Sequence, residues 1–270
     1  MKIPLQFVRY CFIIGLRLVW GVYDVLGEVI SVLSGKGGTG KSALCAGVAT
    51  ALAASGKRVL CIDCDMGLRS LDIYLALSGV EALSFLDVCS GNYPLSAASV
   101  HPQFPCLSFL TAPINCSAEA IDPLLFQRML HQAKEHFDFV LLDGPGGIGE
   151  GMRLCAQFAD RCILVTLPDP AAIRSADRAT QELEKMGANN VRLVVNRVYN
   201  DILKAMGKTI DDMMDEIGLP LLGIVPSDMD IGYAAAKGKP FIKYSRNGAA
   251  AAYKRIAKRI LGLPVPVANR

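Results

Sequence analysis

The sequence predicts an α/β fold in which a mostly parallel, twisted sheet is covered by helices on both faces. Apolar runs alternate with helical patterns from Val29 onward, and this alternation is typical of parallel strands joined by crossover helices. A glycine-rich loop separates the first apolar run from the first helical stretch, and two later runs end in aspartate. In such folds the carboxyl ends of the strands open into a ligand crevice. The sequence therefore places its candidate site at that edge of the sheet.

The composition is that of a globular protein, because 52% of the 270 residues are hydrophobic and 20% are charged. The net charge of +3 is too small to require a nucleic-acid partner. Nine cysteines lie in apolar stretches, which is typical of a reduced cytosol. Cys61 and Cys64 form a C-x-x-C on a predicted strand, where their spacing points the side chains to opposite faces. We predict that they pack in the core and form no redox or metal pair.

Residues 1–28 do not follow the alternating pattern. Arg9, Arg17 and Asp24 interrupt their apolar run before it reaches the length of a membrane span, and no small-x-small cleavage site follows. Three interpretations stay open: an interfacial anchor, an extra helix, or a translation start placed too far upstream, which is favoured. The chain thus divides into the extension 1–28, a folded domain 29–263 and a short tail 264–270.

The glycine loop runs from Gly35 to Ser42, between a predicted strand at 29–33 and a predicted helix at 42–54. It satisfies G-x-x-x-x-G-K-[ST], in which glycines turn backbone N–H groups toward phosphate oxygens and a helix N-terminus adds its dipole. The loop predicts a P-loop NTPase in which Lys41 neutralises the β- and γ-phosphates and Ser42 binds Mg²⁺. The loop residues expected to contact the nucleotide are Gly35, Lys36, Gly37, Gly38, Thr39, Gly40, Lys41, Ser42 and Ala43.

Lys36 is a second lysine inside this loop. The loop resembles the deviant Walker A motif of the MinD/ParA family of P-loop ATPases, K-G-G-x-G-K-[ST]. The resemblance implies that Lys36, like Lys41, is catalytic and that it reaches the nucleotide of a partner in an ATP-dependent homodimer. An ordinary solvated loop cation is the alternative interpretation of Lys36.

The next predicted strand, 58–63, ends in carboxylates. The segment from Asp63 to Asp72 resembles the family's D-x-D-x-G-L-R-N-L-D, especially its MinD branch. The resemblance assigns Asp63 and Asp65 to the attacking water, as catalytic residues, and Asp65 also to the magnesium environment. A turn residue or helix cap is the alternative for either aspartate.

A further apolar run, 139–143, ends in Asp143 and has the Walker B pattern. A buried strand here would deliver Asp143 beside the glycine loop, where it holds Mg²⁺ through the metal's water shell. The following residues resemble the MinD segment D-x-P-A-G-I-E, the switch that senses the γ-phosphate. Gly146 stands in place of Ala and Gly149 in place of Glu, a departure that bears on partner contacts more than on ATP hydrolysis.

The adenine side of the site is expected where two later strands end. Asn196 and Arg197 end the strand 192–197, and the family places this pair beside adenine, where an amide can bond the base and a guanidinium can stack on it. The segment 223–228 resembles the family's G-x-I-P-x-D, which lines the base pocket. Pro226 and Asp228 are the residues carried over from it.

The remaining elements are expected to be structural. Helices are predicted at 83–89, 122–137 and 209–217, and strands at 107–110 and 162–166. The core side of the second helix is predicted to be Leu125, Met129, Leu130, Ala133 and Phe137.

The last predicted helix, 249–261, has an apolar side that ends with Leu261 and a basic side formed by Lys254, Arg255, Lys258 and Arg259. A basic amphipathic helix can lie on anionic lipid; the alternative is a helix that covers the sheet. The separate amphipathic tail that MinD proteins carry after this helix has no counterpart in the segment 264–270.

The resemblance spans 29–263 and implies a Mg²⁺-dependent ATPase that regulates the placement of the division septum. It implies a cytoplasmic protein that can lie peripherally on the inner face of the cell membrane. Expected partners are a second copy of the chain, division inhibitor and activator proteins of the Min type, and an anionic membrane surface. The alternative is a ParA-like partitioning or flagellar-placement ATPase that acts on DNA or a polar landmark. Iron–sulfur carriers share the fold but need a late cysteine pair, and no cysteine follows Cys162.

Overall fold

The computed structural model describes residues 26–267. The prediction for the extension 1–28 therefore lies almost entirely outside the described residues, as do the last three residues of the tail. Eight strands form one sheet in the order β3-β4-β2-β5-β1-β6-β7-β8. Among them only the short edge strand β3 pairs antiparallel, which confirms the predicted, mostly parallel sheet. The strands are β1 Glu28–Ser34, β2 Val59–Asp63, β3 Ser99–Val100, β4 Leu107–Leu110, β5 Phe139–Gly146, β6 Arg161–Thr166, β7 Val191–Val198 and β8 Leu221–Pro226.

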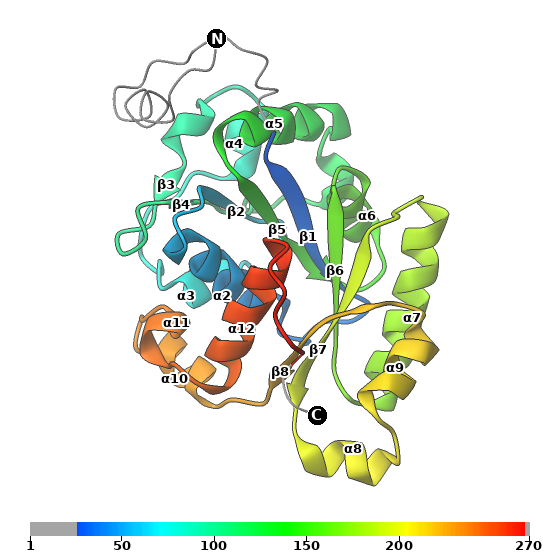
Figure 1. Ribbon diagram of the computed structural model, residues 1–270. Coiled ribbons are helices and arrows are strands. Elements are labelled where there is room, and N and C mark those ends of the chain that lie inside the picture. Colours follow the sequence, from blue (N-terminus) through cyan, green and yellow to red (C-terminus); the bar gives the residue numbers. More distant parts are fainter. Residues whose placement is uncertain (1–25, 268–270) are drawn as a thin grey trace, which may run out of the picture.

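Helices cover both faces of the sheet (Figure 1). One face is covered by α2, α3 and α10–α12, the other by α4–α7 and α9. Side chains of a strand alternate between the two faces of the sheet, and both faces are buried here. The sequence of β1 is therefore mostly apolar along its whole length. The helices are α2 Lys41–Ala54, α3 Leu71–Leu75, α4 Phe85–Cys89, α5 Pro123–His136, α6 Glu150–Gln157, α7 Pro170–Lys185, α8 Asn200–Met206, α9 Ile210–Ile217, α10 Asp230–Ala236, α11 Phe241–Tyr244 and α12 Gly248–Ile260.

The predicted apolar sides of α5 and α12 pack against the core, with two differences in detail. Phe126 of α5 is fully buried against Phe85, with ring centroids 5.6 Å apart, whereas Leu125 and Phe137 are only partly buried. Phe126 thus joins the predicted core side of α5, and Leu125 and Phe137 pack against the same cluster. The last helix ends at Ile260, one residue before Leu261, which is only partly buried.

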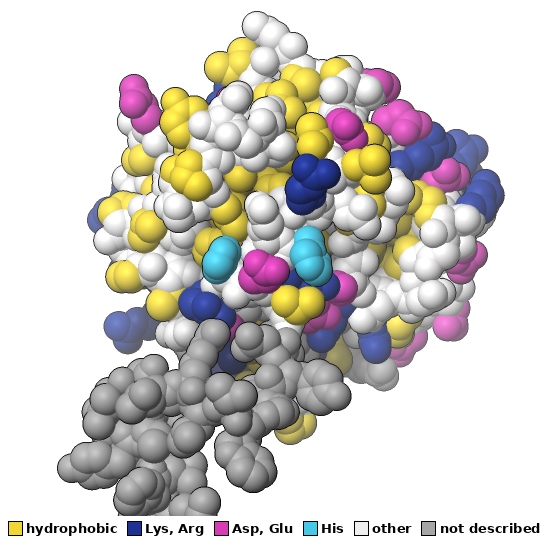
Figure 2. Space-filling view, turned by 90° about the horizontal axis from the view of Figure 1, so that it is seen from above, with side chains coloured by type: hydrophobic (Ala, Val, Ile, Leu, Met, Phe, Trp, Pro, Cys, Tyr) yellow, Lys and Arg dark blue, Asp and Glu magenta, His cyan; other side chains and the backbone are white. Residues whose placement is uncertain are grey.

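Apart from β3, the strands all point toward one edge of the sheet, so the two ends of the molecule differ in chemistry. Figure 2 looks onto the amino-terminal ends of the strands and shows hydrophobic, basic and acidic side chains interspersed there. The glycine loop lies at the opposite, carboxyl-terminal end, because it follows β1 directly. Within the described part of the chain, no helix has the length and apolar character that crossing a membrane requires.

Candidate nucleotide-binding site

Three neighbouring strands bring the predicted site residues together. In the sheet β5 lies between β2 and β1. Asp63 at the end of β2 is the register partner of Asp143 in β5, and Val32 of β1 is level with the same residue. Both carboxylates therefore meet beside the loop that leaves β1, as the sequence predicted.

The glycine loop and the switch segment that follows Asp143 each require glycine, for different reasons. Gly38 and Gly40 have φ of +77° and +88°, left-handed values that side-chain-bearing residues rarely adopt. At Gly146 in the switch segment, an added Cβ would lie 2.7 Å from the Cα of Gly37. The switch thus packs directly on the glycine loop, and any side chain at Gly146 would push the two apart.

Lys41 begins α2 and is 6% exposed. Burial lowers the pKa of its ammonium group, and the negative charges of Asp143 and Asp65 only partly oppose this. A buried ammonium whose charged form is penalised by desolvation gains from an anion placed beside it. This environment fits the phosphates of a nucleotide on the adjoining loop.

Asp143 is completely buried, and neither of its carboxylate oxygens has a hydrogen-bond partner of normal geometry. Burial raises its pKa to about 8, and the negative charge of Asp63 adds to this, while the Ser42 hydroxyl and the charge of Lys41 lower it. A buried carboxylate with no partner calls for a cation. Mg²⁺ is typically held by one or two carboxylates together with substrate phosphates and water, so the site fits Mg²⁺ that arrives with a nucleotide.

Asp63 and Asp65 both accept backbone hydrogen bonds. One oxygen of Asp63 accepts from the N–H of Asp65 (2.9 Å) and the other from the N–H of Leu71 (3.1 Å). Asp65 in turn accepts from Gly67 (3.2 Å) and Leu68 (3.1 Å). Burial raises the pKa of Asp63 to about 6, although the hydrogen bonds that Asp63 accepts from Leu71 and Asp65 lower it. The turn and cap role is thus present in both residues, and their role toward the attacking water stays a prediction.

Lys36 is engaged within its own chain. Its Nζ lies 3.2 Å from both carboxylate oxygens of Asp169, and about one third of each side chain is exposed. Asp169 is also the N-cap of α7 and accepts from the N–H of Ala172 at 2.8 Å. The sequence did not predict this pairing, although Asp before Pro170 at a helix start indicates an N-cap.

On the predicted adenine side, Asn196 and Asp228 make hydrogen bonds that join separate segments of the chain. Asn196 is buried, and its amide donates to the carbonyl of Thr39 in the glycine loop at 2.8 Å. Arg197 has φ of +54° and lies beside Gly40. Asp228 accepts from Asp230 and Ala249, both at 3.0 Å, and so joins α10 to α12. Direct contact of these residues, or of Pro226 at the end of β8, with a base stays a prediction.

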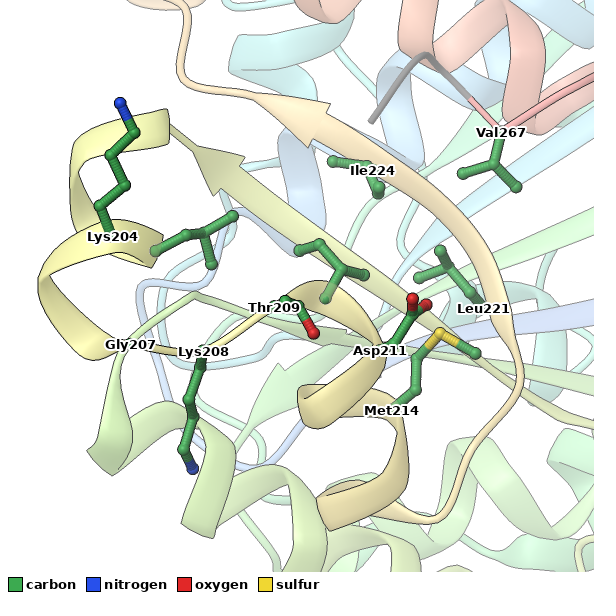
Figure 3. Close-up of a pocket in the computed structure, with 11 residues that line it drawn as sticks. Lys204, Gly207, Lys208, Thr209, Asp211, Met214, Leu221, Ile224 and Val267 are labelled. Atoms are coloured by element: carbon green, nitrogen blue, oxygen red, sulfur yellow. The ribbon is translucent and has the colours of Figure 1, made fainter.

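A cavity of about 720 Å³ lies away from this site, between β8, α8 and α9 (Figure 3). Its apolar lining includes Met214, Leu221 and Ile224, and two lysines, Lys204 and Lys208, also border it. None of the predicted site residues lines it.

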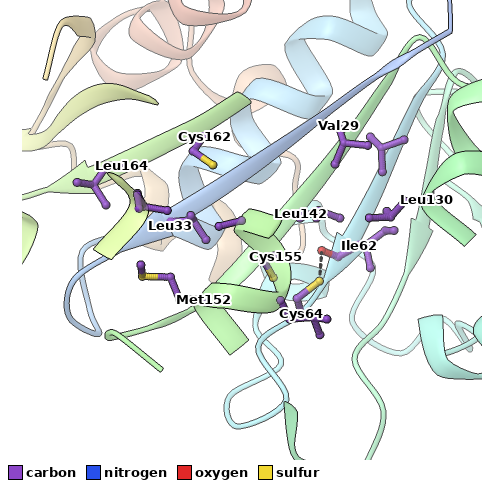
Figure 4. Close-up of a cluster of buried hydrophobic side chains, with 14 of the residues drawn as sticks. Val29, Leu33, Ile62, Cys64, Leu130, Leu142, Met152, Cys155, Cys162 and Leu164 are labelled. Carbon is purple, nitrogen blue, oxygen red and sulfur yellow. Dashed lines mark hydrogen bonds between the residues drawn. The ribbon is translucent and has the colours of Figure 1, made fainter. Parts of the chain in front are cut away.

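The prediction that Cys61 and Cys64 pack in the core on opposite faces is confirmed. Cys61 packs in the core beneath α2 and α12, and Cys64 in the core on the other face. Figure 4 shows Cys64 among apolar side chains close to Cys155 of α6. The described cysteines are free thiols, and the described residues hold no group of three or more His, Cys, Asp and Glu that could bind a metal by themselves.

A pH dependence of stability follows from Asp143. Its pKa of about 8 in the folded chain lies above the ordinary 3.8, so the folded state keeps a proton that the unfolded state loses. Stability without nucleotide should therefore fall as pH rises from about 4 to about 8. We expect the melting temperature to drop between pH 6 and 8 in the wild type and to drop less in Asp143→Asn. Parallel melting curves in thermal denaturation would contradict the assignment.

Comparisons with known proteins agree with this geometry. A family model described as "ParA: NUBPL iron-transfer P-loop NTPase" matches residues 26–261. The septum site-determining protein MinD of Bacillus subtilis (strain 168) is 38% identical over 249 residues, covering 90% of this chain and 92% of that protein. The MinD of Synechocystis sp. is 35% identical over 246 residues, covering 89% and 92%.

Solved structures give the same result. A chain of the MinC:MinD cell division protein complex of Aquifex aeolicus superposes with a TM-score of 0.83 at 32% identity, covering 90% of this chain and 99% of that one. The septum site-determining protein MinD of Pyrococcus horikoshii OT3, complexed with Mg-ADP, superposes with a TM-score of 0.75 at 27% identity, covering 87% and 96%.

Proposed function

The chain belongs to the MinD/ParA family of P-loop ATPases, and on that premise we propose that it acts as a nucleotide-controlled switch in the placement of the division septum. It is a MinD-like ATPase that uses Mg²⁺ and converts ATP to ADP and phosphate. The observation that carries the proposal is the buried, unpartnered carboxylate of Asp143 beside Lys41 and the glycine loop.

Each residue has a distinct task in this reaction. The N–H groups of the glycine loop bind the phosphates, and Lys41 neutralises their charge. Ser42 and Asp143 hold the magnesium, with Asp65 nearby, and the metal supplies charge neutralisation at the transferred phosphate. Asp63 orients the attacking water. Asn196 fixes the loop from behind through Thr39, so the phosphate cradle exists before the nucleotide binds.

Dimerisation would be controlled at Lys36. In the single chain its charge is satisfied by Asp169 at 3.2 Å, an ion pair of the partly exposed kind that contributes little stability. A nucleotide phosphate on a second copy would offer Lys36 a stronger partner than Asp169. ATP would thus favour the homodimer, and hydrolysis would end it.

Proteins of the Min type are the proposed partners. The Aquifex aeolicus relative is a component of a MinC:MinD complex, and by homology this chain would bind a division inhibitor and an activator. The switch segment carries Gly146 and Gly149 where the MinD pattern has Ala and Glu. We therefore place the differences in partner recognition at this segment, where Ile148 is 38% exposed.

An anionic membrane surface is the remaining proposed partner, and charge distribution supports it. From 231 to 267 the chain has eight basic residues and no acidic one. Within residues 26–267, none of the eight forms an ion pair with a carboxylate. Arg259 is used internally, donating to the carbonyls of Leu222 (2.6 Å) and Val265 (3.1 Å). The apolar side of α12 covers the sheet, so only its basic side could meet lipid, as a cytoplasmic protein lying on the inner face of the membrane.

Co-sedimentation of the full chain with vesicles rich in anionic lipid tests this function. We expect pelleting with ATP and much less with ADP. The triple variant Lys254→Gln, Arg255→Gln, Lys258→Gln should bind about a hundred-fold more weakly, because each basic residue near an anionic surface contributes about 1 kcal/mol. The control is Arg128→Gln, Arg174→Gln, Arg192→Gln, which removes equal charge from elsewhere.

The outcomes separate the interpretations. If the triple variant and the control pellet alike, α12 is not the anchor and the extension 1–28 becomes the candidate. If the wild type hydrolyses ATP but stays in solution with both nucleotides, the ParA-like alternative on DNA or a polar landmark is the better account. The family description names iron transfer, but the chain has no cysteine after Cys162, so we do not extend that role to it.

A further inference from the structure

Ser70 is the residue before α3, and its side chain does not cap that helix. A serine at this position usually accepts a hydrogen bond from an N–H of the first helical turn. The hydroxyl of Ser70 makes no such bond. It donates instead to the hydroxyl of Ser42 at 3.0 Å, 28 residues away in the glycine loop.

Asp63 explains why the Ser70 hydroxyl is free to do this. Its carboxylate accepts from the N–H of Leu71, the first residue of α3, at 3.1 Å. The N-terminus of the helix therefore has a carboxylate acceptor, which also suits the helix dipole. The hydroxyl of Ser70 is then available for a contact outside its own helix.

The backbone before Ser70 is strained in a way that fixes its position. Arg69 has φ of +47°, a left-handed conformation that is unfavourable for a residue other than glycine. Its guanidinium donates to the hydroxyl of Thr111 at 3.1 Å, which ties the turn to the end of β4. Strain of this kind persists only where surrounding contacts enforce it. Here the turn that contains Arg69 holds the Ser70 hydroxyl beside that of Ser42.

We propose that Ser70 is a positioning residue for magnesium, which orients the Ser42 hydroxyl toward the metal site beside Asp143. A hydroxyl has one proton and two lone pairs. If one lone pair of Ser42 accepts from Ser70, the other is left for Mg²⁺, and its proton is left for a phosphate oxygen or for Asp143. The family pattern that the segment 63–72 resembles has Asn at this position, and an amide can also donate. The same hydrogen bond links the metal site to the turn that carries Asp63 and Asp65.

The inference rests on the proposed Mg²⁺–nucleotide site. Two substitutions of Ser70 whose new side chains have nearly the same shape test it. Ser70→Thr keeps the hydroxyl and Ser70→Val removes it. Binding of a fluorescent ADP to the full chain is measured across a Mg²⁺ titration and again in EDTA. We expect Ser70→Thr to match the wild type within about twofold. Ser70→Val should weaken the apparent Mg²⁺ affinity about fivefold, the effect of one neutral hydrogen bond, with ADP affinity in EDTA unchanged.

Other outcomes overturn the inference in distinguishable ways. Equal Mg²⁺ dependence in the Thr and Val variants means that the hydroxyl does not position Ser42. A loss of ADP affinity in EDTA as large as the loss with Mg²⁺ means that Ser70 only supports the loop. If the wild type itself binds ADP equally with and without Mg²⁺, the magnesium site fails and the inference fails with it. Ser70→Ala gives the same comparison with the wild type should the valine variant not fold.

Discussion

Lys41→Ala is expected to abolish nucleotide binding and, with it, ATP turnover. Lys41 is 6% exposed at the start of α2. Its buried positive charge acts on the phosphates together with the backbone N–H groups of the glycine loop. Removing a preorganised donor from a site that excludes water costs roughly 10²- to 10³-fold in rate. The loss should be larger here, because the full charge on the phosphates would stay uncompensated near Asp143 and Asp63.

Fluorescent ATP binding and phosphate release measure the effect of Lys41→Ala, with Lys57→Ala as the control. Lys57 is an exposed lysine just after the same helix, so its loss changes net charge equally without touching the loop. Wild-type ATP affinity in Lys41→Ala would refute the P-loop assignment.

Lys36→Ala is expected to leave nucleotide binding by the single chain intact and to remove the ATP-dependent dimer. The side chain of Lys36 is one third exposed and points to Asp169, so its loss disturbs no core packing. What is lost is the charge that we propose reaches the nucleotide of the second copy. Light scattering in Mg-ATP and in Mg-ADP measures the mass in each state.

Asp169→Asn is the matched control for Lys36→Ala. It breaks the intrachain ion pair but retains the lysine, and asparagine can still cap α7 as Asp169 does. This variant should dimerise with ATP at least as well as the wild type. A dimer that survives Lys36→Ala unchanged would refute the role of Lys36 between subunits.

The sequence predicts the fold and the centre of the site because both depend on local patterns. Strand β5 is buried on both faces, so it appears as a run of apolar residues, and Asp143 follows that run within the strand, level with the end of β2. The glycine loop is recognisable because its backbone conformation requires glycine at Gly38 and Gly40. These signals need no knowledge of distant contacts.

The remaining features depend on contacts between segments far apart in the chain. Ser70 meets Ser42 across 28 residues, and Lys36 meets Asp169 across 133. Neither pair has a spacing that a local pattern could reveal. Asn196 was predicted from the family as a base contact, yet its amide is bonded to the glycine loop. An amide at the end of a strand can serve either task, and only the position of Thr39 decides which partner it meets in this structure.

Calorimetric titration of the full chain with a non-hydrolysable ATP analogue, first with Mg²⁺ and then with the metal chelated, tests the central claim most directly. The account predicts one nucleotide per chain and clearly weaker binding without Mg²⁺, because the phosphates would then lack the metal's charge and the buried oxygens of Asp143 would lack their proposed partner. Absence of binding, or equal affinity with and without Mg²⁺, would contradict it.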